Sequence, residues 1–278
     1  MSDQEQRQKA DDFRALHHGD APLVLANIWD AGSAVLAASL GFPALATTSA
    51  GVAWALGYPD GERMQRREML AAVERIAARV ALPLSADMEG GYGATPGEVA
   101  ETMRATISAG AIGVNLEDGL DHAAGTLRGL NLAVECIAAA RAAGEAAGVP
   151  LVINARTDVY FDRDATADEK FKEAVARANA YLEAGADCAF VIAVSEAAAI
   201  GELAREIDGP VNIIAGAGGL DINGLAELGV KRISLAGGMT RAVFGTLKGA
   251  FEEIRDAGSI GFLEGGMAHP ELNKLFET

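Results

Sequence analysis

Cysteine, basic residues and long hydrophobic runs are all scarce in this chain of 278 residues. Its two cysteines, Cys136 and Cys188, lie far apart and form no CxxC motif. We therefore expect two free thiols that pack as small apolar residues in a reducing compartment. No apolar run approaches the roughly 20 residues that a membrane-spanning helix needs. These absences argue against a disulfide scaffold, a cysteine-based zinc site and a membrane span.

Positive charge is also in short supply, because 23 Lys and Arg face 39 Asp and Glu, a formal net charge of −16. An acidic surface argues against nucleic acid or an anionic membrane as a partner. The first twenty residues are charged and lack an apolar core, so they predict no signal peptide. We expect a soluble, cytoplasmic protein. A local pocket can still hold an arginine for an anionic substrate.

Eight short apolar runs recur along the chain, and helical patterns separate them. Each run is bounded by Gly or Pro, as buried parallel strands are. Eight strand–helix units predict an α/β fold, specifically a (β/α)8 barrel of the TIM type. A doubly wound open sheet is the alternative, which a strand count leaves open. The runs are PLVLANIWD, FPALATTSAG, LPLSADMEGG, AIGVNLEDG, PLVINARTD, CAFVIAV, PVNIIAG and KRISLAGG.

The helical segments carry their own start and stop signals. Thr95, Pro96 and Glu98 are typical of an N-cap, a first helical position and a capping box. Several helices are expected to end at glycines just before the next strand. The expected helices are 69–81, 95–111 and 165–186, and the expected C-terminal glycines are Gly110, Gly148, Gly185 and Gly229.

The chain shows no linker rich in Pro, Gly or Ser, so we expect one domain over 1–278. Its barrel core is predicted at about 20–255, after an N-terminal helix. The tail at about 256–278 carries apolar residues on a polar background, with Gly265-Gly266 before a further short helix. We expect this helical extension either to pack on a neighbouring subunit or to fold back on its own barrel.

Polar side chains follow several of the apolar runs where each predicted strand ends. In a barrel these ends meet at one face, which carries the active site. Alternate strand residues share a side, so Asp87 lies with Glu89, and Asn115 with Glu117. Converging carboxylates repel, and a divalent cation neutralises them. Carboxylate oxygens suit Mg²⁺ or Mn²⁺.

Arg156 ends another strand, where an unpaired buried cation is costly. It is either a bidentate clamp for a substrate carboxylate or a structural salt-bridge partner of Asp158 or of a neighbouring strand. Asp60, in the loop GYPDGE, is either a site residue or a turn residue. The backbone N–H groups of the run Thr47–Gly51 are suited to holding an anion.

Four segments in order carry a family resemblance: ATTSAGVAWALGYPDGE, LPLSADMEGGYG, GAIGVNLEDG and INARTD. Over roughly 20–255 the chain resembles the isocitrate lyase / phosphoenolpyruvate mutase superfamily. The resemblance implies an α/β barrel, Mg²⁺, and cleavage of C–C or P–C bonds in small 2-oxo or 2-hydroxy acids through an enolate. It also implies a C-terminal helix swapped between subunits, hence a homodimer or homotetramer.

The resemblance further implies a role for each matching residue. Asp87 would be the direct metal ligand, and Arg156 would bind the substrate carboxylate. We therefore predict Asp87, Glu89 and Glu117 as metal residues and Asp60, Glu117 and Arg156 as catalytic residues. The predicted substrate-binding residues are Thr47, Thr48, Ser49, Asp87 and Arg156.

The chain also departs from the family pattern. Isocitrate and methylisocitrate lyases carry a Cys-Gly-His run after the ED strand, whereas this chain has DGLDHAAGTLRGL, without cysteine. That difference argues against either lyase. His122 stands there as an acid or base candidate, although a solvated loop histidine is the more typical interpretation. The runs FVIAV and IIAGAGG lack the polar residues that relatives often place there, which indicates a roomier, less polar pocket.

Three hypotheses follow. The leading one is a Mg²⁺-dependent lyase or decarboxylase acting on a small 2-oxo or 2-hydroxy acid. Protonation by water would make the missing cysteine dispensable. The second is a phosphonate mutase or hydrolase, although the expected gating-loop residues and a basic phosphate site beyond Arg156 are not seen. The third is a catalytically weak binding protein for 2-oxo acids, against which the retained carboxylates argue.

Overall fold

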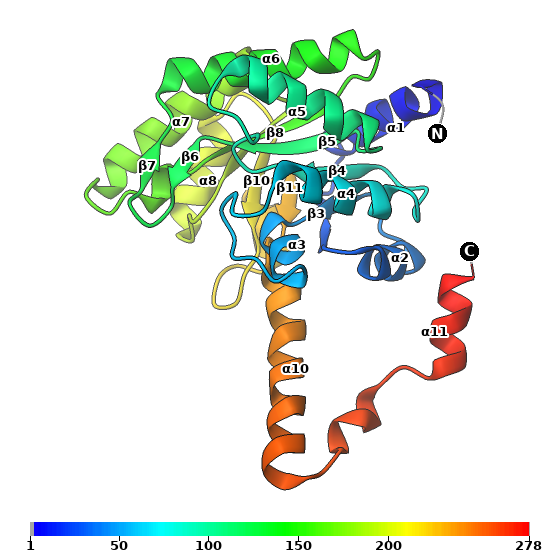
Figure 1. Ribbon diagram of the computed structural model, residues 1–278. Coiled ribbons are helices and arrows are strands. Elements are labelled where there is room, and N and C mark those ends of the chain that lie inside the picture. Colours follow the sequence, from blue (N-terminus) through cyan, green and yellow to red (C-terminus); the bar gives the residue numbers. More distant parts are fainter. Residues whose placement is uncertain (1–2, 278) are drawn as a thin grey trace.

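The computed structural model describes residues 3–277 and shows an α/β barrel surrounded by helices (Figure 1). Its nine strands are all parallel and run in the order β1-β11-β10-β9-β8-β5-β4-β3-β2. The two end strands, β1 (Leu23–Val24) and β2 (Ala26–Ile28), are consecutive in the chain. Leu25 between them donates its N–H to the Ile233 carbonyl. The sheet therefore closes on itself almost completely, which confirms the barrel and excludes the open sheet.

Each of the eight predicted apolar runs contains strand. The first supplies both β1 and β2, which together occupy one position in the barrel. A separate antiparallel hairpin stands between β5 and α6. The other strands are β3 (Leu45–Thr47), β4 (Leu84–Asp87), β5 (Gly113–Glu117), β8 (Val152–Thr157), β9 (Cys188–Val191), β10 (Val211–Ile214) and β11 (Arg232–Ser234), and the hairpin is β6 (Gly119–Asp121) with β7 (Thr126–Leu127).

The helices begin and end close to the expected residues. Thr95 caps α5, its hydroxyl accepting from the Glu98 N–H, and Glu98 returns the bond to complete the capping box. The four predicted C-terminal glycines all have φ between 70° and 107°. The helices are α1 (Asp3–Leu16), α2 (Ala31–Ser39), α3 (Ser49–Ala55), α4 (Arg66–Ala77), α5 (Pro96–Ser108), α6 (Leu130–Ala146), α7 (Ala167–Glu183), α8 (Ala197–Glu206), α9 (Ile222–Glu227), α10 (Gly238–Ala257) and α11 (His269–Phe276), with 3₁₀ turns η1 (Val159–Phe161) and η2 (Gly261–Gly265).

Polar side chains are buried within the barrel strands beneath the mouth. The Asn154 amide donates to Asn115 Oδ1 at 2.7 Å, and Arg232 Nη2 donates to the same oxygen at 3.2 Å. Because three strands separate β11 from β5 on this side of the sheet, the Arg232 contact crosses the barrel. These hydrogen bonds connect β5, β8 and β11 inside the barrel. The carboxyl ends of β5 and β8 carry the charged residues of the site described below.

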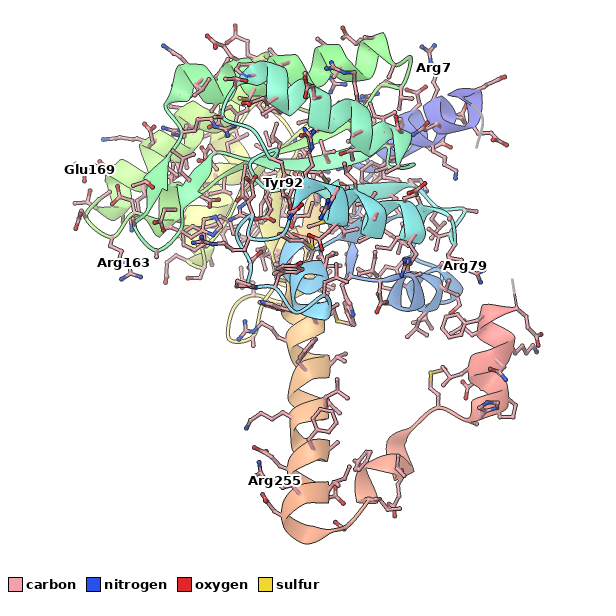
Figure 2. All side chains as sticks on the ribbon, in the orientation of Figure 1. Arg7, Arg79, Tyr92, Arg163, Glu169 and Arg255 are labelled. Carbon is pink, nitrogen blue, oxygen red and sulfur yellow. The ribbon has the colours of Figure 1, made fainter. Side chains whose placement is uncertain are left out.

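Helix α10 runs away from the barrel, and Figure 2 labels Arg255 near its far end. The chain then turns back, and α11 lies against α2. Arg79 Nη2 donates to the Phe276 carbonyl at 3.1 Å. Within residues 3–277, none of the helices combines the length and apolar character that crossing a bilayer demands. The exposed apolar residues of α10 are Met239, Val243, Phe244, Leu247, Phe251 and Ile254.

Candidate active site

A cavity of about 1210 Å³ opens at the carboxyl ends of the barrel strands. A second hollow of about 290 Å³ adjoins it and shares two lining residues with it, Asp60 and His122. The smaller hollow also contains Glu89 and Glu117. The polar side chains of the larger cavity are those of Thr48, Ser49, Asp60, Asp87, His122, Asp221, Asn223, Arg156 and Arg241.

Asp87 is the last residue of β4 and is buried at the cavity wall. Its Oδ2 accepts the Ser49 N–H at 2.8 Å, and its own N–H donates to Thr47 Oγ1 at 2.8 Å. Its second oxygen, Oδ1, is buried and has no hydrogen-bond partner among the described residues. Thr47 does not line the cavity, so its side chain orients the Asp87 backbone. Asp87 thus presents one fixed, unsatisfied carboxylate oxygen.

Glu89 follows β4 in a strained backbone conformation, with φ of 50°. Its Oε2 accepts the Glu62 N–H at 2.5 Å, and the Tyr92 hydroxyl donates to its Oε1 at 3.3 Å. Tyr92 is labelled near the middle of Figure 2. Burial, followed by repulsion from Asp87 and Glu117, raises the pKa of Glu89 to about 8. The local chain therefore holds a carboxylate where negative charge is unfavourable without a cation.

Asp60 lies at the mouth, exposed to solvent, and lines both hollows. Partial desolvation and then the charge of Asp87 raise its pKa. It forms no ion pair among the described residues. Asp60 therefore lies where a site residue could act, and its catalytic role stays a prediction.

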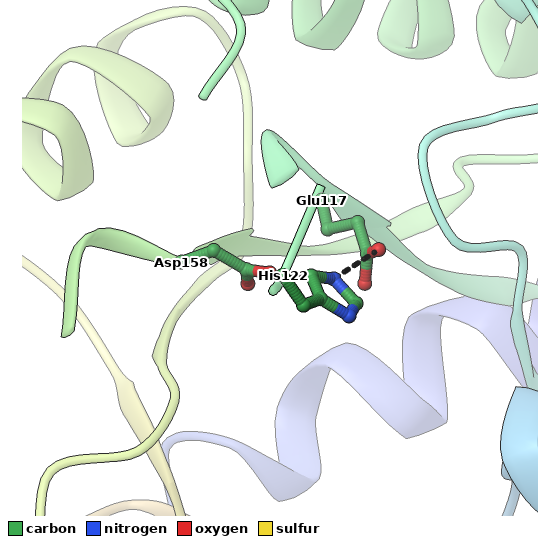
Figure 3. A group of neighbouring side chains, drawn as sticks. All are labelled: Glu117, His122 and Asp158. Atoms are coloured by element: carbon green, nitrogen blue, oxygen red, sulfur yellow. Dashed lines mark hydrogen bonds and ion pairs between the residues drawn. The ribbon is translucent and has the colours of Figure 1, made fainter. Parts of the chain in front are cut away.

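One charged cluster at the mouth consists of Glu117, His122, Arg156 and Asp158. Figure 3 shows three of its members, Glu117, His122 and Asp158. Arg156 Nη1 pairs with Glu117 Oε2 at 2.5 Å. Arg156 Nε and Nη2 donate to the two oxygens of Asp158 at 2.6 and 2.9 Å. The salt-bridge interpretation of Arg156 is therefore confirmed, and its role as a clamp for a substrate carboxylate stays a prediction for a side chain that lines the cavity.

His122 is not a solvated loop residue. Its Nε2 lies 2.8 Å from Asp158 Oδ2 and 3.3 Å from Glu117 Oε1, and its ring stacks on Phe161. Hydrogen bonds to Asp158 and Glu117 raise its pKa to about 10. The ring is therefore protonated at neutral pH and donates to Asp158. His122 Nε2 also lies 3.3 Å from Arg156 Nη2. Because both groups are then cations that can only donate, this contact is not a hydrogen bond.

The acidic residues of the site fit a divalent cation. Burial raises the pKa of Glu117, while Arg156 and His122 oppose that shift. The buried, unpartnered Asp87 Oδ1 is the oxygen most in need of a positive partner. Ligand atoms of Glu117, His122 and Asp158 also lie within 4.8 Å of one another. In that group, however, both carboxylates are already paired with Arg156. The predicted metal residues Asp87, Glu89 and Glu117 offer carboxylate oxygens, the ligand type that Mg²⁺ and Mn²⁺ prefer. Among the described residues, however, they do not form a group with ligand atoms that close together, and Glu117 is itself paired with Arg156.

Asp118, next to Glu117, turns away into the helical layer. Its Oδ2 accepts from the Tyr181 hydroxyl at 2.6 Å and from Arg177 Nη1 at 3.1 Å. Its Oδ1 accepts the Asp158 N–H at 2.9 Å. These bonds make Asp118 a support for the site, since they fix the backbone of Asp158.

The sequence reasoning missed two features of the site. The sequence indicates Asp158 only as a possible partner of Arg156. In the structure, Asp158 pairs with both Arg156 and His122. Phe161, stacked on His122, was not foreseen. The spacing of Asp158 two residues after Arg156 was the available signal, because alternate strand residues share a side.

Comparisons with known proteins agree with the barrel fold. The family model described as phosphoenolpyruvate phosphomutase matches residues 13–255. The chain is 34% identical to 2-methylisocitrate lyase of Escherichia coli over 204 residues, 72% of this chain and 67% of that one. It is 31% identical to oxaloacetate decarboxylase of Rhodopseudomonas palustris over 255 residues, 88% of this chain and 85% of that one.

A crystal structure from Burkholderia cenocepacia, whose name gives only the class lyase/mutase, superposes with a TM-score of 0.91 at 38% identity. The match covers 99% of this chain and 98% of that one. The barrel, the carboxylate-ringed mouth and these matches lead to one conclusion. The chain belongs to the phosphoenolpyruvate phosphomutase family and is an enzyme of the isocitrate lyase / phosphoenolpyruvate mutase superfamily.

Proposed function

We propose that the protein is a Mg²⁺-dependent carbon–carbon lyase or decarboxylase acting on a small 2-oxo or 2-hydroxy carboxylic acid. The observation that carries the proposal is the buried Asp87 carboxylate, with one unsatisfied oxygen, in the cavity that Arg156 also lines. The names of the relatives support it, since 2-methylisocitrate lyase and oxaloacetate decarboxylase are among them.

The reaction requires stabilisation of negative charge. In decarboxylation the C3–C4 electron pair becomes that of an enolate, and charge develops on the 2-oxo oxygen. In cleavage of a 2-hydroxy acid the C2–C3 bond breaks, the hydroxyl loses its proton, and C3 gains one. Fixed cationic groups near these oxygens stabilise the transition state. Arg156, held by Glu117 and Asp158, provides one such group on this chain.

A divalent cation held by Asp87, Glu89 and Glu117 would supply a second electrophile. Thr48 and Ser49 line the cavity beside Asp87 and would contact the substrate there. Their backbone N–H groups, expected to hold an anion, instead donate to the Ile28 carbonyl and to Asp87 Oδ2. Asp60 is a solvent-exposed carboxylate at the mouth, with no ion pair among the described residues, and we assign it as the base for a substrate hydroxyl. Water entering the open cavity protonates the carbon product, so the reaction does not depend on the missing cysteine.

We also propose that the chain acts as a homodimer or homotetramer through α10. Six apolar side chains of this helix are exposed, and the helix extends away from its own barrel (Figure 1). Such a face is costly in water, and a second copy of the chain would cover it. A swapped C-terminal helix is the arrangement that fits.

The experiment is a screen of purified protein with Mg²⁺ against oxaloacetate, malates, isocitrate, methylisocitrate and phosphonopyruvate. We expect release of pyruvate or glyoxylate from an oxaloacetate or malate, lost in Asp87→Asn. Asp208→Asn, at an exposed loop position outside both hollows, serves as the control and should retain activity. Turnover of phosphonopyruvate alone would favour P–C chemistry instead. Binding of 2-oxo acids without any turnover would indicate a binding protein.

A further inference from the structure

Arg128 is a buried arginine that lies outside the charged cluster of the mouth and contacts the turn after Glu89. It comes directly after β7, and its Nη2 donates to the Gly90 carbonyl at 3.2 Å and to the Gly93 carbonyl at 2.9 Å. Among the residues that the structure describes, Arg128 forms no ion pair. A buried cation without a carboxylate is costly, so its charge depends on the carbonyl groups of this turn.

The other contacts of Arg128 hold it in place from the side of the helices. Its N–H donates to the Asp118 carbonyl at 2.7 Å, and its own carbonyl accepts from Arg177 Nη1 at 3.0 Å. Its Nη1 donates to Cys136 Sγ at 3.2 Å. Because both the backbone and the guanidinium are fixed, Arg128 can hold the turn in one position.

The turn that Arg128 contacts has a strained backbone. Glu89 and Tyr92 have φ values of 50° and 51°, and Glu62, which bonds to both, has a φ of 51°. These are three of the five non-glycine residues with positive φ in the described part of the chain. Such conformations persist only where the surrounding contacts over-determine them, and Arg128 supplies a contact at each end of this turn.

The strained turn fixes two of the predicted site residues. The Glu62 N–H donates to Glu89 Oε2, and the Tyr92 N–H donates to Glu62 Oε1 at 3.0 Å. The Tyr92 hydroxyl donates to Glu89 Oε1 at 3.3 Å. Glu62 is two residues after Asp60, so the same hydrogen bonds also hold the Asp60 loop. Glu89, Asp60 and Arg128 all line the smaller hollow.

We propose that Arg128 is a positioning residue, which holds the Glu89 carboxylate and the Asp60 loop at the smaller hollow through the turn Gly90–Gly93. This inference rests on the proposed function, in which Glu89 is a metal residue. Arg128 acts through the turn and needs no contact with the substrate. Loss of a group that orients a metal ligand weakens metal affinity about ten- to a hundredfold.

The test measures two properties of the full chain: amide hydrogen exchange of residues 88–93 without metal, and Mn²⁺ affinity by calorimetry. Arg128→Met keeps the length of the side chain and removes its donors. We expect the N–H groups of Gly91 and Tyr92 to exchange at least tenfold faster, since exchange reports local opening. Mn²⁺ affinity should fall about ten- to a hundredfold. Arg128→Lys keeps the charge and one donor group, so both losses should be smaller.

Arg141→Met is the matched control. Arg141 also donates to backbone carbonyls, to that of Leu151 at 2.7 Å and to that of Gly185 at 2.9 Å, but it lies outside both hollows. Its loss should lower the stability of the fold and leave the exchange of residues 88–93 and the Mn²⁺ affinity unchanged. If Arg128→Met does not fold, Arg128→Lys provides the same two comparisons.

Wild-type exchange of residues 88–93 in the Arg128 variants would overturn the inference. Equal effects of Arg128→Met and Arg141→Met on exchange and on Mn²⁺ affinity would overturn it too, because they would show a general structural role. Faster exchange with unchanged Mn²⁺ affinity would overturn the link from the turn to Glu89. Failure of the proposed function is separable: a wild type that binds no Mn²⁺ would remove the metal, and exchange alone would then decide the role of Arg128.

Discussion

Arg156 and Glu117 are register partners in the parallel ladder of β8 and β5, and their side chains pair at 2.5 Å where both strands reach the cavity. The pairing of the two strands therefore sets the position of the cation that faces the substrate. Both side chains are buried, at 10% and 6% exposure. A buried pair of this kind is costly to break from one side, because the other charge is left alone.

Replacing Arg156 should cost stability as well as activity. Arg156→Met leaves Glu117 and Asp158 without their guanidinium, and we expect unfolding to become about 3–5 kcal/mol easier. Arg156→Lys keeps the charge but loses the fork to Asp158, so it should cost less. Urea denaturation measures both. Arg255→Met removes an exposed pair with Asp256 and should leave the stability nearly unchanged. Equal losses at the two sites would contradict the buried cluster.

The Tyr181 hydroxyl should contribute to stability through Asp118. Tyr181→Phe deletes a 2.6 Å bond to a buried carboxylate, and we expect a loss of about 1–3 kcal/mol in denaturation. Burial already raises the pKa of Asp118, so losing a donor disfavours its charged form further. Tyr160→Phe is the matched control, since its hydroxyl has no hydrogen bond among the described residues. A Tyr181→Phe protein as stable as the control would mean that Asp118 does not depend on this bond.

His17 should make stability depend on pH. Burial, then the charge of Arg232, lowers its pKa to about 4, against about 6.5 in an unfolded chain. Between these values the unfolded chain holds a proton that the folded chain lacks. This residue's contribution therefore falls as pH falls from about 6.5 to 4, by about 1.4 kcal/mol per pH unit and about 3 kcal/mol in all.

The slope of the unfolding free energy against pH measures how many more protons the unfolded chain binds than the folded chain. In His17→Gln that number should fall by about one between pH 4 and 6.5. His18→Gln, at the exposed neighbouring position, is the control substitution. Denaturation at a series of pH values measures both variants. The same slope in His17→Gln as in the wild type would show that the buried imidazole is not the titrating group.

The apolar face of α10 should control assembly. Phe244→Glu combined with Leu247→Glu places two charges on this face, and we expect light scattering to show monomers where the wild type forms dimers or tetramers. Lys248→Ala, on an exposed residue paired with Glu252, should not change the assembly. A wild-type chain that is monomeric at micromolar concentration would refute the proposed oligomer.

The strands, caps and strand-end residues could be predicted because they depend on local signals. Thr95 and Gly110 act within one helix, and Asp87 and Arg156 follow from the rule that barrel strands carry the site at their carboxyl ends. The environment of His122 could not be predicted in this way. It depends on the hairpin β6–β7, whose turn uses Asp121 Oδ1 as acceptor for the N–H groups of Ala123 and Ala124.

That hairpin brings His122 to Asp158, which lies 36 residues later in the chain, and no short pattern encodes such a contact. The sequence likewise predicts Thr47 as a substrate contact, because the backbone N–H groups of the run Thr47–Gly51 suit an anion. Its hydroxyl instead accepts the Asp87 N–H beneath the cavity. The direction of α10 also lies beyond local signals, since its apolar face would suit its own barrel as well as a neighbouring one.

The most direct test of the central claim is ¹³C NMR of labelled oxaloacetate and malates incubated with the protein, with Mg²⁺ and then with excess EDTA. The account predicts new pyruvate, or a 2-oxo acid with its partner carboxylate, at a rate that EDTA and Asp87→Asn each lower at least a hundredfold. Intact substrates in the presence of Mg²⁺, or the same rate in Asp87→Asn, would contradict it.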